Sequence, residues 1–124
     1  MMRIKEKLVR LTGDVVTAVI LDLYMGWSYW SLWVGDPEIP VCATQGWVER
    51  PLSELKDDVK IPGISESAIQ QRLEWLVLNG FLDARPGSAP EICQYRANVY
   101  VVKRGLFAIG CVEEPEYPPL WWEE

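Results

Sequence analysis

The sequence predicts an α+β fold, in which a small antiparallel sheet and several helices share one core. Apolar residues recur with a helical period from about residue 15, which indicates a long helix. A short extended piece, two helices and a hairpin then follow one another within residues 47–102. The 124 residues suffice for one domain with its own core, and a hydrophobic content of 49% argues against a disordered chain.

The long helix is predicted to start at Val15. Thr12 or Asp14 precedes it, and either side chain can accept a hydrogen bond from the first free N–H groups of the helix. The apolar positions beyond this cap have helical spacing and predict one broad buried face: Val16, Val19, Ile20, Leu23, Tyr24 and Trp27. Trp30 and Trp33 continue this aromatic series, which is expected to fill the core, with stacking on nucleic-acid bases as the alternative.

A loop, an extended piece and a short helix are predicted next. Residues 35–46 contain two prolines and show no period, which is typical of a loop. Residues 46–50 have the pattern of an extended piece, and Pro51 occupies a position that the first turn of a helix tolerates. The apolar stripe of the expected short helix consists of Leu52, Leu55 and Val59.

A second helix is predicted over residues 65–79. The sequence Ile-Pro-Gly at 61–63 separates it from the first, Ser65 is its expected N-cap, and Gly80 ends it. Its predicted core face consists of Ile69, Leu73, Leu76 and Val77, and its predicted polar face of Ser67, Gln70, Gln71 and Glu74. A nucleic-acid groove or a protein partner would meet the polar face, although a plain solvated surface has the same composition.

A β-hairpin completes the predicted order. Its strands are expected at residues 81–85 and 92–102, and the sequence Pro-Gly-Ser-Ala-Pro at 86–90 favours a turn between them. A helix-turn-helix followed by a hairpin is the winged-helix arrangement, which points toward nucleic acid. The predicted architecture is therefore a winged helix-turn-helix with an additional long N-terminal helix.

Three segments are expected along the chain. A basic N-terminal arm (1–11) precedes the winged-helix domain (12–104), and an acidic, aromatic and proline-rich tail (105–124) follows it. The tail is expected to bind a partner, to fold back on the domain, or to compete with DNA for basic residues of the hairpin. Because seven tryptophans exceed what one small core readily hides, a homodimer is also predicted, with an interface drawn from Trp30, Trp33, Trp121 and Trp122.

Composition argues against several classes of function. The chain has no histidine, which removes the commonest general base and metal ligand, and it has no glycine-rich phosphate loop. Cys42, Cys93 and Cys111 form no C-x-x-C pair and are expected to be reduced thiols. We therefore expect no catalysis, no metal, no cofactor and no small-molecule substrate. The longest apolar stretch is too short to cross a membrane and no secretion signal is evident, so a cytoplasmic location is predicted.

The order of several short strings carries a family resemblance. They are Leu-Thr-Gly-Asp at 11–14, Gly-Trp-Val at 46–48, Leu-Ser-Glu-Leu at 52–55, Ser-Glu-Ser-Ala-Ile-Gln-Gln-Arg-Leu at 65–73, Leu-Asn-Gly-Phe-Leu at 78–82 and Tyr-Arg-Ala-Asn at 95–98. Together they resemble the N-terminal winged-helix domain of plasmid and phage replication initiators. The resemblance implies a second helix in the major groove and a hairpin at the backbone or minor groove. It implies base reading by Ser67, Gln70, Gln71 and Arg72, and phosphate contacts by Arg85 and Arg96.

The predicted function is binding of double-stranded DNA, in replication initiation or transcription regulation. Lys103 and Arg104, which follow the predicted hairpin, are also grouped with the nucleic-acid-binding residues. The net charge of −6 departs from the basic surface that DNA-binding domains usually carry. Two alternatives therefore remain at this stage: a protein–protein interaction or dimerisation module that binds no DNA, and an acidic mimic of DNA.

Overall fold

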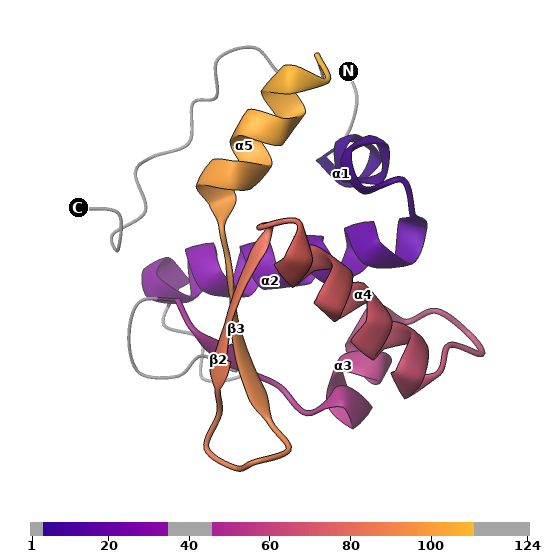
Figure 1. Cartoon of the computed structure of the whole chain (residues 1–124), viewed down its shortest axis with the longest axis vertical. Helices are drawn as coiled ribbons and strands as arrows, with labels where there is room; N and C mark the ends of the chain where they lie inside the picture. The colour runs from indigo at the N-terminus through magenta and orange to yellow at the C-terminus, as the bar shows by residue number, and fades with distance from the viewer. Residues whose placement is uncertain (1–3, 35–45, 111–124) are drawn as a thin grey trace.

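A computed structural model describes residues 4–34 and 46–110, and Figure 1 shows how their elements are arranged. In chain order the elements are α1 (Ile4–Thr12), α2 (Val15–Val34), β1 (Val48–Glu49), α3 (Leu52–Val59), α4 (Glu66–Leu78), β2 (Leu82–Pro86), β3 (Cys93–Ala97) and α5 (Val99–Ala108). The fold of these residues is α+β, because the helices accompany one small antiparallel sheet. Within the described ranges, no helix combines the length and apolar character that spanning a bilayer requires.

Helix α2 begins where the sequence predicts and forms the middle of the core. Asp14 caps it, since the Oδ2 atom of Asp14 accepts hydrogen bonds from the N–H of Thr17 at 3.0 Å and from its hydroxyl at 2.7 Å. Ile20, Leu21 and Tyr24 are completely buried. Helices α1, α3 and α4 and the sheet all contact α2. These contacts on several sides explain why the helix is apolar on more than one face.

Helix α4 begins and ends within one residue of its predicted bounds, 65–79, and α3 contains the predicted apolar stripe. The connection between them uses two residues in the left-handed region, Lys60 at φ 57° and Gly63 at φ 77°. Ser65 caps α4 as predicted, because its hydroxyl oxygen accepts a hydrogen bond from the N–H of Ala68 at 3.1 Å. Gly80 follows α4 at φ 80°, a conformation that glycine adopts without strain.

The three strands form an antiparallel sheet in the order β1-β3-β2. Tyr95 of β3 lies opposite both Val48 of β1 and Ala84 of β2, which fixes the register. Side chains alternate between the two faces of the sheet. The core face buries Val48, Leu82, Tyr95 and Ala97, and the other face carries Glu49, Asp83, Arg85, Gln94 and Arg96.

The chain after the hairpin differs from the prediction. The second strand was predicted to continue through residue 102, but it ends at Ala97 and helix α5 follows. Asn98 caps this helix, since its side-chain oxygen accepts a hydrogen bond from the N–H of Val101 at 3.2 Å. The β-branched residues favour a strand locally, but their helical spacing allows one face to be buried, and burial outweighs the small difference in propensity. The residues buried in this way are Val99, Val102 and Leu106.

Both ends of the described chain contribute to the core. The predicted basic arm, residues 1–11, contains most of α1, and Leu8 of this helix is completely buried. Leu11 packs against α5 at Gly105, where an added Cβ atom would lie 2.7 Å from the Cδ1 atom of Leu11. The predicted boundary between residues 104 and 105 lies inside α5. Helices α1 and α5 therefore extend the core beyond residues 12–104.

Candidate nucleic-acid interface

Helix α4 presents a polar surface on the side away from the core. Its core residues are buried as predicted, apart from the partly buried Val77. Ser67, Gln71 and Glu74 are exposed and lie three or four residues apart, which places them on one face. Serine and glutamine can hydrogen-bond to base edges, whereas a carboxylate can only accept, usually from the N4 amino group of cytosine. This surface therefore offers hydrogen-bonding groups but no cation of its own.

Arg72 lies on the flank of α4 and not on this polar surface. Its Nε atom is 3.3 Å from the Oδ2 atom of Asp14, and its Nη1 atom donates to the carbonyl of Ala68 at 3.1 Å. Hydrogen bonds from Thr17, with a smaller contribution from Arg72, lower the pKa of Asp14. The prediction grouped Arg72 with the base-reading residues, but the structure places its guanidinium against the start of α2.

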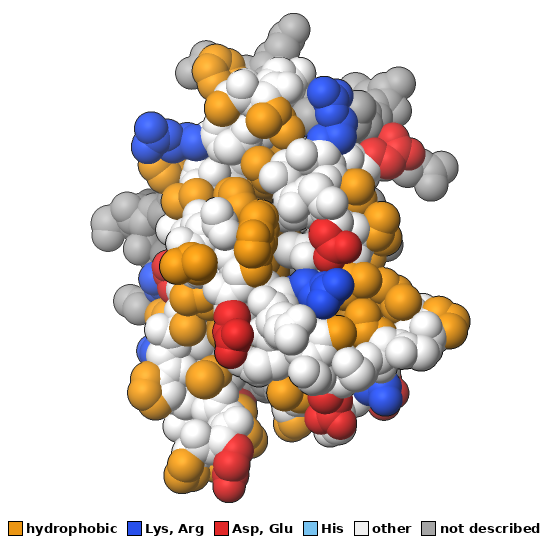
Figure 2. Space-filling view, turned by 45° about the vertical axis from the view of Figure 1, so that its right-hand side comes forward, with side chains coloured by type: hydrophobic (Ala, Val, Ile, Leu, Met, Phe, Trp, Pro, Cys, Tyr) orange, Lys and Arg blue, Asp and Glu red, His pale blue; other side chains and the backbone are white. Residues whose placement is uncertain are grey.

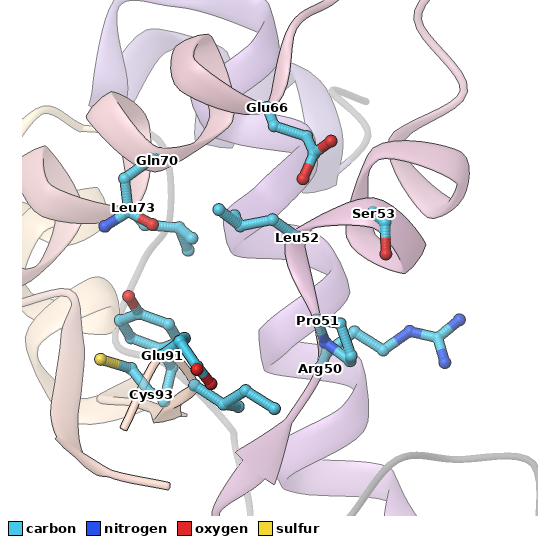
Figure 3. Close-up of a pocket in the computed structure, with 11 residues that line it drawn as sticks. Arg50, Pro51, Leu52, Ser53, Glu66, Gln70, Leu73, Glu91 and Cys93 are labelled. Carbon is cyan, nitrogen blue, oxygen red and sulfur yellow. The ribbon is translucent and has the colours of Figure 1, made fainter. Parts of the chain in front are cut away.

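Gln70 faces a groove between α4, α3 and the hairpin. The groove has a volume of about 470 Å³, and Figure 3 shows Gln70 and Glu66 on one side of it, with Glu91 and Cys93 on another. Gln70 is half-buried, and its Nε2 atom lies 3.4 Å from a carboxylate oxygen of Glu74. Burial is the main cause that raises the pKa of Tyr95, which lines this groove, to about 12.

The arginine beside this groove is not turned toward it. Figure 3 shows the guanidinium of Arg50 pointing away from the other lining residues. It makes two hydrogen bonds to the carboxylate of Asp58, at 2.8 and 2.9 Å, and a third at 3.2 Å to Glu54. The hydrogen bonds that Arg50 donates to Asp58 are the largest cause that raises the pKa of Arg50. Since carboxylates of Glu66 and Glu91 line the groove, it is a poor site for a phosphate group.

The two hairpin arginines share one aromatic platform. The guanidinium carbons of Arg85 and Arg96 lie 4.4 and 4.6 Å from the ring centroid of Trp47, which is within the range of cation–π contacts. Arg85 also donates to Gln94 at 2.6 Å, and Arg96 forms an ion pair with Asp83 at 3.2 Å. Of the two, Arg85 is exposed and Arg96 is half-buried. The structure thus brings together the two residues that were predicted to contact phosphates.

Glu49 joins the hairpin turn to β1, a role that the sequence analysis missed. Its two carboxylate oxygens accept hydrogen bonds from the N–H and the hydroxyl of Ser88, both at 2.6 Å, and one of them accepts from Gln94 at 3.2 Å. These hydrogen bonds lower the pKa of Glu49 below its ordinary value of 4.5, and the bond from the Ser88 hydroxyl contributes most. Side chains two residues apart along a strand lie on the same face of the sheet. The spacing of Trp47 and Glu49 is therefore the sequence signal that places both of them on the outer face.

This attachment has a measurable pH dependence. We expect Ser88→Ala to raise the pKa of Glu49 in an NMR titration of the carboxyl carbons, and Ser67→Ala, a change of another exposed serine, to leave it unaltered. Because the pKa is lower in the folded state, the contact stabilises the hairpin above pH 4.5 and this stabilisation is lost as the pH falls through the folded-state pKa. An unchanged Glu49 titration in Ser88→Ala would show that the attachment does not form.

Lys103 and Arg104, two further predicted site residues, are not brought to the hairpin. Lys103 and Arg104 belong to α5, and Figure 1 places α5 and the hairpin turn at opposite ends of the molecule. Trp30 and Trp33 occur in the last turns of α2, but their side chains lie outside the described residues, as do Trp121 and Trp122. The predicted partner interface therefore remains a prediction.

The charge of the described part is balanced. Residues 4–34 and 46–110 contain eleven Lys or Arg and eleven Asp or Glu residues, so the net charge of −6 belongs to the rest of the sequence. Figure 2 shows basic and acidic groups scattered over one face, without a continuous basic patch. A basic excess occurs at one end only, where the sequences of α1 and α5 together carry five basic residues and one acidic residue.

No group of three or more His, Cys, Asp or Glu residues in the described ranges is arranged to hold a metal ion. The comparisons with known proteins also leave the functional class of the protein open. No protein-family model, no curated protein and no solved structure matches the chain. The case for a function therefore depends on the topology and on the residues described above.

Proposed function

We propose that this chain is a winged helix-turn-helix module that binds duplex DNA without catalysing a reaction. The observation that carries the proposal is the order α2-β1-α3-α4-β2-β3 together with the sheet order β1-β3-β2. This order contains a helix-turn-helix pair followed by an antiparallel hairpin, the combination that defines winged-helix proteins. A role in replication initiation is part of the proposal and is supported by the resemblance of the sequence strings.

In the proposed complex, α4 enters the major groove and the hairpin lies along the DNA backbone. Ser67 and Gln71 are the exposed groups of α4 that can hydrogen-bond to base edges. Arg85 is the exposed arginine of the hairpin, and its stacking on Trp47 holds the guanidinium in place. Arg96 has a supporting role, because its ion pair with Asp83 and its contact with Trp47 hold the same surface in place.

The proposal gives a test with a matched control. We expect Arg85→Ala to weaken binding to all duplexes by about tenfold at about 50 mM salt, because one phosphate contact and one released counterion are lost. Arg10→Ala removes the same charge from an exposed site on α1, at the other end of the molecule, and should leave the affinity unchanged. Gln71→Ala should reduce discrimination between sequences more than total affinity. Fluorescence anisotropy with random and selected duplexes measures all three variants.

Two outcomes would contradict this proposal. The first is the absence of binding to any duplex at low salt, where phosphate contacts are strongest. The second is an equal loss of affinity in Arg85→Ala and Arg10→Ala, because an attraction spread over the whole surface would not require the winged-helix interface.

A protein–protein interaction module is the second candidate, and a specific feature favours it. Leu78 at the end of α4 is 86% exposed, and Trp75 on the same helix is 38% exposed. Exposed large apolar residues, and aromatic ones among them, are typical of protein interfaces. Self-association in sedimentation that Leu78→Ser abolishes, combined with no DNA binding, would favour this candidate over the first.

A further inference from the structure

Helix α5 carries an outward strip of apolar and basic side chains, defined by Tyr100, Arg104 and Phe107. Their spacing of four and three residues places them on one face of the helix. Tyr100 is 55% and Phe107 60% exposed, and the exposed guanidinium of Arg104 lies 5.6 Å from the ring of Tyr100. The other side of α5 is buried in the core. A short helix that is apolar on both sides indicates a surface that another segment covers.

The charge of the strip limits what that segment can be. The sequence of α5 contains Lys103 and Arg104 and no acidic residue. Arg104 takes part in none of the four ion pairs formed among the described residues. The complementary partner is therefore a segment that combines large apolar side chains with carboxylates.

The segment of this chain that follows α5 has this composition. Residues 111–124 contain five glutamates and no Lys or Arg, together with Leu120, Trp121 and Trp122. We propose that residues 111–124 dock on the α5 strip of the same chain. The side chains of Leu120, Trp121 and Trp122 cover Tyr100 and Phe107, and glutamates of the segment pair with Arg104.

The length of the segment allows this contact within one chain. Helix α5 has ten residues and a length of about 15 Å at 1.5 Å per residue. The ten residues 111–120, which follow Gly110, can span up to about 33–36 Å, so Leu120 can reach any part of the strip. A short tether also gives an effective concentration in the millimolar range, at which a few aromatic and ionic contacts suffice. These two facts favour the chain's own segment over a second copy.

Two-dimensional NMR of the full chain tests the proposal in both directions. We expect the double variant Trp121→Ser, Trp122→Ser to shift the amide resonances of Tyr100, Arg104 and Phe107, which lie 14 to 22 residues away in sequence. In the reverse direction, Phe107→Ser and Arg104→Glu should each shift the indole N–H resonances of Trp121 and Trp122. Arg104 and Phe107 are exposed, so circular dichroism should report an unchanged fold for their variants, and the same measurement checks the tryptophan variant.

A matched control and a dilution series complete the test. Lys56→Glu makes the same charge change at an exposed site on α3 and should leave both indole resonances in place. The shifts should be the same when the protein is diluted about tenfold, because an intramolecular contact does not depend on concentration. Shifts that disappear on dilution would assign the strip to a second copy and overturn the proposal. So would α5 resonances that do not respond to the tryptophan changes.

Discussion

Leu76→Ala should lower the free energy of unfolding by about 2–5 kcal/mol, and Leu73→Ala by a similar amount. Both side chains lie on the core face of α4 and are at most 1% exposed. Truncation removes buried methyl groups and leaves a cavity that neighbours such as Ile69 and Ile20 cannot fill without moving. Denaturant midpoints with unchanged m-values would report the loss.

The same helix supplies a control for this expectation. Leu78 is on α4 and 86% exposed, so Leu78→Ala removes the same atoms without creating a cavity, and a change within about 0.5 kcal/mol is expected. If Leu73→Ala and Leu76→Ala also changed stability by less than about 1 kcal/mol, α4 would not be packed as described.

Gly87→Ala should have the second largest effect, a destabilisation of about 1–3 kcal/mol. A Cβ atom at this position would overlap the backbone carbonyl oxygen of Ile92 and lie 2.8 Å from the carboxylate of Glu49. The N–H of Gly87 also donates to the same carbonyl at 2.8 Å, so the backbone cannot move away without losing that bond. Thermal or denaturant unfolding measures the change, and loss of the Glu49–Ser88 contact should accompany it.

Gly26→Ala is the control, and it should have the opposite sign. Gly26 is in the interior of α2, and apart from the helix's own backbone an added Cβ atom would have no atom of the described residues within 4 Å. Alanine in a helix interior is more favourable than glycine by about 0.5–1 kcal/mol, so a small stabilisation is expected. Equal effects of the two substitutions would mean that the close approach at the hairpin turn does not exist.

The neutrality of the described part changes how the acidic composition bears on DNA binding. The excess of acidic residues belongs to residues outside the described ranges, so the part that would contact a duplex carries no net negative charge. An attached acidic segment nevertheless repels phosphate when it is near the hairpin. Docking of residues 111–124 on α5 would hold it at the end of the molecule that Figure 1 shows opposite the hairpin turn.

Local signals in the sequence were sufficient for most of the secondary structure. The caps at Asp14 and Ser65, the turn-forming residues at 86–90 and the apolar period of α4 each act within a few residues, so they could be interpreted without the fold. One exception was helix α1, which lies in the segment predicted as a basic arm. The other was the valine-rich stretch after Ala97. Its local preference for a strand was overruled by burial against the core, which involves residues far away in the sequence.

The sequence by itself therefore determined the α+β class, the order of the elements from α2 to β3, and the polar face of α4. Only the tertiary structure decided which arginines of α4 and the hairpin already have a partner within the protein. Arg72 was predicted to read bases, but it pairs with Asp14, 58 residues earlier, and the two hairpin arginines stack on Trp47. An arginine is ionised in any context, yet its role depends on the carboxylate or ring that folding brings within reach. That distance is a property of the packed core and not of the local sequence.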